Sequence, residues 1–154
     1  MSSLDLGGTY RISTRLPIGN GYILGIDQEN PQGIKPIITY PASTTGDHTI
    51  WKVEVAQDTD SGYRLECGGY KVFANGGSLW GAKIEDDPIV NAAIWQIKAG
   101  GNPTLPDGKF YSVGVANETV GWWLNGLGEG SSIAIRSSAI APGSYELLFK
   151  FIPL

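Results

Sequence analysis

The chain has 154 residues, enough for one domain, and its 22 glycines and 9 prolines exclude a mainly helical fold, because both residue types destabilise helix interiors. Hydrophobic residues make up 42%, which excludes a disordered chain, and charged residues make up 17%, below the roughly 25% of an average soluble domain. The net charge of −4 argues against nucleic acids and anionic membranes as partners.

Four short runs recur three times along the chain, in repeats of about 8–57, 62–100 and 108–154. Each run is rich in β-branched and aromatic residues and is bounded by turn-forming residues, which is typical of short strands. In chain order, the predicted strands are residues 8–13, 21–25, 34–38 and 50–55, then 62–67, 69–73, 81–84 and 94–98, then 108–113, 121–124, 132–135 and 147–151. We expect one domain spanning 1–154.

Apolar and polar side chains alternate within several runs, as they do in a strand with one buried face. Trp51, Val53 and Val55 alternate with Lys52 and Glu54. Three units of four strands, each needing the others to bury an apolar face, predict an all-β protein of the β-trefoil type. In that fold six strands form a barrel and six form three capping hairpins. The aromatic residues that recur once per repeat then fill the core. They are Tyr10, Tyr63, Tyr111, Trp51, Trp95 and Phe149.

The sequence lacks the motifs that an enzyme would need. The one histidine, His48, could act as a general base, but no nucleophile motif accompanies it, and we interpret it as a polar loop residue before a strand. Cys67 alternates onto the apolar side of its run, which predicts a buried, unreactive thiol. The acidic segments 58–62 and 85–88 could attract calcium, but tight turns favour the same residue types. We therefore expect no enzymatic activity, no cofactor and no metal site.

Cysteine content and the first residues bear on the compartment. A single cysteine cannot form an internal disulfide, and residues 1–5 lack the basic and apolar regions of a secretory signal peptide. No apolar run reaches the length of about 18 residues that a membrane-spanning helix needs. We expect a monomeric, cytoplasmic protein.

Short motifs spread over nearly the whole chain resemble those of one family. They are Gly-Thr-Tyr-Arg-Ile at 8–12, Tyr-Ile-Leu-Gly at 22–25, Asp-Gln-Glu-Asn at 27–30, Ile-Lys-Pro-Ile at 34–37, Ile-Trp-Lys-Val at 50–53, Thr-Val-Gly-Trp at 119–122 and Ser-Ile-Ala-Ile-Arg at 132–136. Together they resemble the mushroom β-trefoil serine protease inhibitors of the cospin and cnispin type. The resemblance implies a fungal protein that blocks a secreted, trypsin-like protease as a defence against grazing animals.

The resemblance also implies a protease-binding loop between the second and third strands. This loop contains Asp27, Gln28, Glu29, Asn30 and Pro31, and the proline stiffens it. Inhibitors of this type use an asparagine as the specificity residue, so Asn30 is the leading candidate.

A second candidate loop connects the last two strands. It begins with Arg136, Ser137 and Ser138, and related inhibitors use this loop as well. The guanidinium of Arg136 could enter a trypsin-like pocket lined by acidic charge.

The alternative function is carbohydrate binding, because other mushroom β-trefoils are lectins. Ricin-type lectin repeats carry a glutamine two residues before the tryptophan of the fourth strand, and this sequence has Thr49, Ala93 and Leu147 there. Three tryptophans remain possible platforms for stacking a sugar ring, and at least one of the adjacent pair should point outward, because strand neighbours alternate faces. They are Trp80, Trp122 and Trp123.

Overall fold

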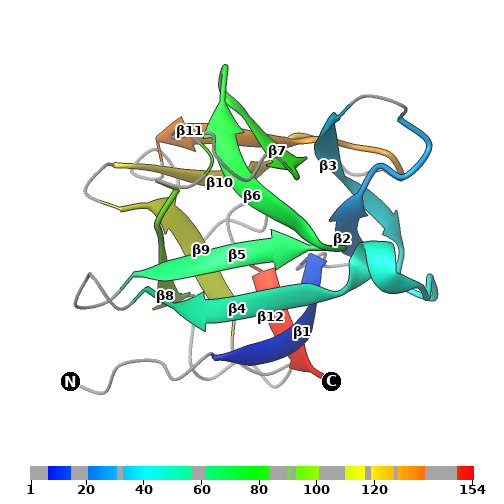
Figure 1. The fold of residues 1–154 in the computed structure, drawn as a ribbon, viewed down its shortest axis with the longest axis horizontal. Helices are drawn as coiled ribbons and strands as arrows, with labels where there is room; N and C mark the ends of the chain where they lie inside the picture. Colours follow the sequence, from blue (N-terminus) through cyan, green and yellow to red (C-terminus); the bar gives the residue numbers. More distant parts are fainter. Residues whose placement is uncertain are drawn as a thin grey trace.

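In a computed structural model, the described part of the chain contains twelve strands and one short 3-10 helix (Figure 1). The described residues are 7–14, 21–30, 33–56, 62–83, 90, 93–100, 110–116, 119–126, 128–137 and 149–154, without the side chains of 99 and 100. The strands are β1 Gly8–Thr14, β2 Tyr22–Ile26, β3 Ile34–Pro41, β4 Trp51–Val55, β5 Tyr63–Cys67, β6 Tyr70–Asn75, β7 Ser78–Ala82, β8 Trp95–Gly100, β9 Phe110–Val115, β10 Val120–Leu124, β11 Ile133–Ser137 and β12 Phe149–Pro153. The helix, η1, is Asp47–Thr49. The prediction of an all-β chain with twelve strands is confirmed for these residues.

The same set of antiparallel pairings occurs in three successive groups of four strands. In each group the first strand pairs with the second and the fourth, and the second pairs with the third. The first group pairs β1 with β2 and β4, and β2 with β3. The second pairs β5 with β6 and β8, and β6 with β7. The third pairs β9 with β10 and β12, and β10 with β11.

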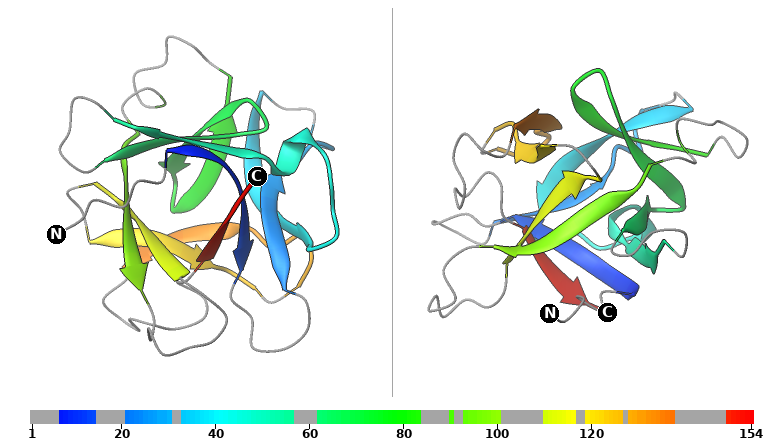
Figure 2. Two further views of the ribbon diagram at one scale, coloured as in Figure 1. Left: turned by 90° about the horizontal axis from the view of Figure 1, so that it is seen from below. Right: turned by 90° about the vertical axis from the view of Figure 1, so that its left-hand side faces the viewer.

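Pairings between the groups build a barrel and a cap. The pairs β4–β5, β8–β9 and β12–β1 join the first and fourth strands of all groups into a closed ring of six (Figure 2). The hairpins β2–β3, β6–β7 and β10–β11 lie above this ring in Figure 1. They contact one another through β3–β7, β11–β7 and the bridge from Ile38 to Ser132. The loops that connect the two strands of each hairpin therefore lie on the cap, away from the barrel.

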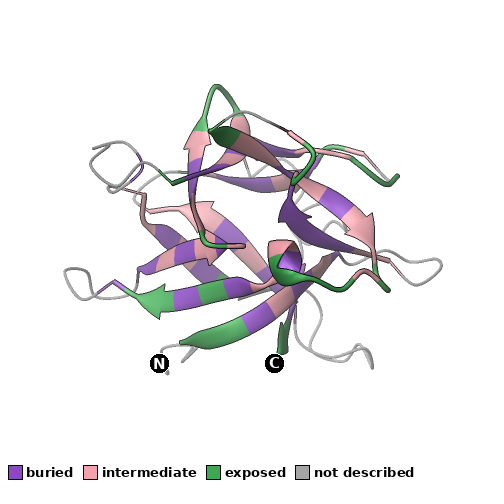
Figure 3. Cartoon of the chain, turned by 45° about the vertical axis from the view of Figure 1, so that its right-hand side comes forward, coloured by how far each residue is buried: buried purple, intermediate pink, exposed green. Residues whose placement is uncertain are grey.

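Burial follows the alternation that the sequence predicts, as the stripes along the strands in Figure 3 show. On β4, Trp51 and Val53 are buried while Lys52 and Glu54 are exposed. Val55 lies on the same side as Trp51 by alternation but is 52% exposed, because β4 ends there. The expected one-sided burial of this strand therefore holds for its first four residues only.

The centre of the core is an aromatic cluster around the indole of Trp122. Its ring centroid lies 5.5 Å from that of Trp51, 5.7 Å from Trp95 and 5.7 Å from Phe149. All four rings are at most 1% exposed, and the three surrounding residues each begin the fourth strand of a group. The predicted core residues Tyr10, Tyr63 and Tyr111 are buried as well. The prediction that Trp122 could be a platform for a sugar ring is thus wrong, because Trp122 points into the core. Its neighbour Trp123 lies on the other face of β10 and is half-buried.

Two of the surrounding rings hydrogen-bond to the hairpin of their own group. The indole N–H of Trp51 donates to the Leu24 carbonyl at 2.9 Å, and that of Trp95 donates to the Val72 carbonyl at 3.2 Å. Phe149 has no such donor. In the first two groups, a buried indole hydrogen bond therefore ties the barrel to the cap in addition to the strand pairing. In the third group, ring packing adds to the pairing of β9 with β10.

Cys67 closes the buried face of β5. It is 0% exposed, and its thiol donates to the backbone carbonyl of His48 at 3.3 Å. Burial raises the pKa of the Cys67 thiol well above its ordinary value. The expected burial of this cysteine is confirmed.

Replacing Trp122 should separate the contribution of its ring from that of its N–H, which is buried and has no hydrogen-bond partner among the described residues. Trp122→Ala should lower the free energy of unfolding by about 3–5 kcal/mol, because it empties the centre of the core. Trp122→Phe keeps a ring there and removes the unpaired donor, so it should cost less than about 1.5 kcal/mol. Urea denaturation measures the free energy of unfolding of both variants and of the wild type. Equal losses in the two variants would contradict this, because they would show that a phenyl ring cannot replace any of the indole's packing.

The thiol of Cys67 should react with a thiol reagent only as fast as the protein unfolds, since the folded state covers it. The unfolded thiol, with a pKa of about 8.5, ionises first as the pH rises, so the free energy of unfolding should fall above about pH 8.5. Labelling in native buffer and in denaturant, with Cys67→Ala as the blank, measures the reactivity. Rapid labelling of the native protein would contradict the observed burial.

Candidate functional site

The turn formed by residues 27–30 follows β2 and contains most of the predicted protease-binding loop. The Asn30 N–H donates to the Asp27 carbonyl at 3.1 Å, and the Asp27 carboxylate accepts the Glu29 N–H at 3.3 Å. At the base of the turn, the Asp27 N–H donates to the Pro36 carbonyl at 3.0 Å. These bonds define a closed turn that Asp27 stabilises through its own side chain, as Asp commonly does.

Exposure differs along this turn. Gln28 and Glu29 are exposed at its tip, whereas Asp27 and Asn30 are half-buried. Pro31, the last residue of the predicted loop, lies outside the described residues. The structure therefore brings four of the five predicted residues together in one turn, with Asn30 at its side rather than at its tip.

Two side chains of β3 hold the turn from the returning strand. Lys35 donates from its Nζ to the Asn30 carbonyl, and the Tyr40 hydroxyl donates to the Ile26 carbonyl at 2.9 Å. Burial raises the pKa of Tyr40, and the negative charges of Asp27 and Glu29 raise it further, so the phenol stays protonated at neutral pH. The sequence analysis missed Lys35 and Tyr40. Counting the register of the β2–β3 hairpin back from the loop would have placed Lys35 near Asn30.

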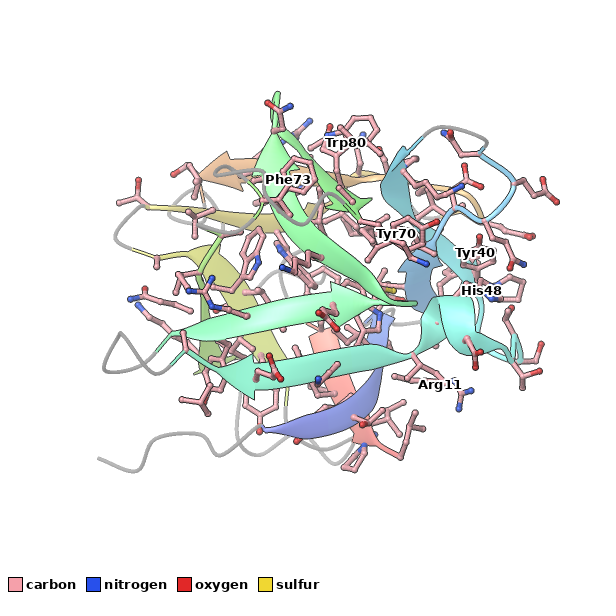
Figure 4. The ribbon with its side chains drawn as sticks, viewed as in Figure 1. Arg11, Tyr40, His48, Tyr70, Phe73 and Trp80 are labelled. Carbon is pink, nitrogen blue, oxygen red and sulfur yellow. The ribbon has the colours of Figure 1, made fainter. Side chains whose placement is uncertain are left out.

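His48 packs beside this hairpin. It lies in η1, and its ring meets the Tyr40 ring edge-on at a centroid distance of 4.8 Å (Figure 4). Its Nε2 atom is buried and has no hydrogen-bond partner among the described residues. A Cβ at Gly25 would lie 2.7 Å from the His48 carbonyl, so close packing there requires glycine. The predicted polar loop residue is thus a half-buried member of a 3-10 turn that supports the hairpin.

The second candidate loop begins at the far end of the cap. Arg136 is exposed near the end of β11 and pairs with Gly121, while Ser137 is half-buried. Ser138 and the rest of that loop lie outside the described residues. In Figure 1 the end of β11 lies on the left and the 27–30 turn on the right.

The positions tied to the lectin alternative differ in accessibility. Thr49 is 0% exposed, and its hydroxyl donates to the Gly46 carbonyl at 2.8 Å, so it is a core residue. Ala93 is half-buried, and Leu147 lies outside the described residues. Trp80 is half-buried, and its indole N–H donates to the Asn75 carbonyl at 2.9 Å. Trp80 also packs on a small apolar cluster separate from the main core. The buried members of that cluster are Phe73, Ala82 and Val90.

In the described ranges, no group of three or more candidate metal-ligating side chains occurs. The acidic residues 58–61 and 85–88 fall outside those ranges. No helix within the described part of the chain is long and apolar enough to cross a membrane.

The chain is similar to known proteins in its fold. No protein-family model matches the sequence, and no curated protein sequence matches it. Among solved structures, a proteinase inhibitor from Coprinopsis cinerea has a TM-score of 0.73 at 21% identity, covering 96% of this chain and 97% of its own. A ricin B-like lectin from Macrolepiota procera, solved with lactose, has a TM-score of 0.69 at 16% identity, covering 99% and 100%. The designed threefold-symmetric protein ThreeFoil has a TM-score of 0.69 at 16% identity, covering 96% and 99%. With the strand pairings above, these likenesses identify the chain as a β-trefoil protein, of the fold that fungal proteinase inhibitors and lectins share.

Proposed function

We propose that this protein inhibits a trypsin-like serine protease by presenting residues 27–31 to the protease cleft, without catalysis and as a one-to-one complex. The observation that carries the proposal is the bonding of the 27–30 turn. Its tip is exposed, while Asp27 and Lys35 bond to its backbone and Tyr40 bonds to the Ile26 carbonyl directly before it. A loop that is already ordered loses little conformational entropy on binding, which favours tight inhibition.

Each residue of the turn makes a different contact with the protease. Asn30 enters the specificity pocket as the contact residue, with its carbonyl fixed by Lys35. Gln28 and Glu29 contact the rim of the cleft from the exposed tip. The structural likeness to the Coprinopsis cinerea proteinase inhibitor supports a protease as the partner class.

Asn30→Ala should weaken inhibition at least tenfold, or about 1.4 kcal/mol, because pocket residues carry most of the binding energy of such interfaces. The thermal midpoint should change little, since the turn lies outside the core. Inhibition constants against a panel of serine and cysteine proteases that includes trypsin measure the effect. Asn75→Ala is the matched control, because Asn75 is an exposed asparagine at a hairpin turn of another group and should leave inhibition unchanged.

The same panel decides between the two loops. If Arg136→Ala weakens inhibition and Asn30→Ala does not, the loop after β11 carries the activity. If the unsubstituted protein inhibits none of the proteases, the inhibitor function is wrong.

Carbohydrate binding is the second candidate function, and the setting of Trp80 favours it. The ring is partly open to solvent, and its hydrogen bond to Asn75 and its packing on Phe73 fix its orientation. A fixed aromatic face is what stacking of a sugar ring requires. The ricin B-like lectin from Macrolepiota procera, which has the same fold, was solved in complex with lactose.

If the protein binds glycans, Trp80→Ala should remove the signal on a glycan array that free sugar competes away. Trp80→Phe keeps an aromatic face, so it is the matched control and should retain most of that signal. Loss of the signal in Trp123→Ala instead would assign the sugar to the other half-buried tryptophan. Strong, sugar-competed binding together with no protease inhibition would favour the lectin function over the inhibitor function.

A further inference from the structure

Two lysines are gathered around one aromatic ring beside the proposed inhibitory turn. Tyr70 begins β6 and is half-buried. The Nζ of Lys83, which follows β7, lies over its ring at 4.7 Å from the centroid, and the Nζ of Lys35 lies at 5.9 Å. Lys35 and Lys83 come together because β3 pairs with β7, with Lys35 opposite Gly81. Figure 4 shows Tyr70 on the side of the molecule that also carries Tyr40 and His48.

Lys35 joins this cluster to the turn. Its ammonium donates to the Asn30 carbonyl and also lies near the Tyr70 ring. The cluster therefore has a fixed position relative to Asn30.

Neither lysine has an ion-pair partner among the described residues. The ion pair between Lys52 and Glu54 lies on β4. The recorded partners of Lys35 are a neutral carbonyl and a ring, and that of Lys83 is a ring. An aromatic face orients a cation but leaves it its full charge. The two ammonium groups therefore form a positive patch beside a turn whose own charges, those of Asp27 and Glu29, are negative.

We propose that Lys35, Lys83 and Tyr70 form a secondary contact site for carboxylate side chains on the rim of the target protease's cleft. This inference depends on the proposed inhibitory role of the 27–31 segment. The turn enters the cleft, and the two ammonium groups pair with acidic residues beside it. Electrostatic complementarity of this kind raises the association rate and selects among partners more than it strengthens the final complex. The target is thus a protease whose rim carries carboxylates where it faces Lys35 and Lys83, and not where it faces Glu29.

Lys83→Glu tests the site, since Lys83 makes no recorded bond to the turn. With trypsin, or the panel protease that the wild type inhibits most strongly, the association rate constant should fall about tenfold at low salt. The difference should shrink to less than twofold at about 1 M salt, where the Debye length is about 3 Å. Lys98→Glu is the control, because Lys98 is an exposed lysine on β8 of the barrel and its substitution changes the net charge equally. Its rate constant should stay within twofold of the wild type at low salt.

The possible results separate the two proposals. Equal rate constants for Lys83→Glu and Lys98→Glu, with inhibition retained, would overturn the contact site and leave the inhibitor function standing. A fall in thermal midpoint of more than a few degrees in Lys83→Gln would show that this ammonium stabilises the fold instead, and would also overturn the site. A wild-type protein that inhibits no protease removes both proposals.

Discussion

The packing of four aromatic rings at the centre of the barrel is the contact on which the rest of the molecule depends. Trp51, Trp95 and Phe149 come from three different groups of strands, and Trp122 touches all three. No single group of four strands encloses a core on its own, because the rings of this cluster come from all three groups. The barrel closes only when all three groups are present, and the cap hairpins take their positions from it.

The sequence predicted this architecture where a local signal existed. Aromatic residues at matched places in three repeats predicted Trp51, Trp95 and Phe149 as core, and alternation predicted the burial of Cys67. The adjacent pair Trp122 and Trp123 was ambiguous, because alternation says that they face opposite ways without saying which faces inward. The pairing of β10 with β9 and β11 determines that choice, and it depends on residues distant in the chain.

The candidate site was predictable to a smaller extent. The position of the 27–30 turn followed from the gap between two predicted strands, but its supports did not. Lys35 reaches Asn30 because of the hairpin register, and it meets Tyr70 because strands of different groups pair in the cap. The first contact could be counted from the hairpin register, but the second has no sequence signature, because it joins strands distant in the chain. Since the same fold carries inhibitors and lectins, only these side chains can distinguish the functions.

The crowding of indoles in the core has an optical consequence. Trp122 lies 5.5 Å from Trp51 and 5.7 Å from Trp95, close enough for their electronic transitions to couple. These rings belong to β10, β4 and β8, one from each group. Far-ultraviolet circular dichroism of the native protein should therefore carry a tryptophan couplet, from the strong indole transition there, that reports on assembly of all three groups at once. A sugar bound at the surface of the cap has no aromatic signal of its own and would leave that couplet intact, which makes the couplet an internal reference for a glycan titration.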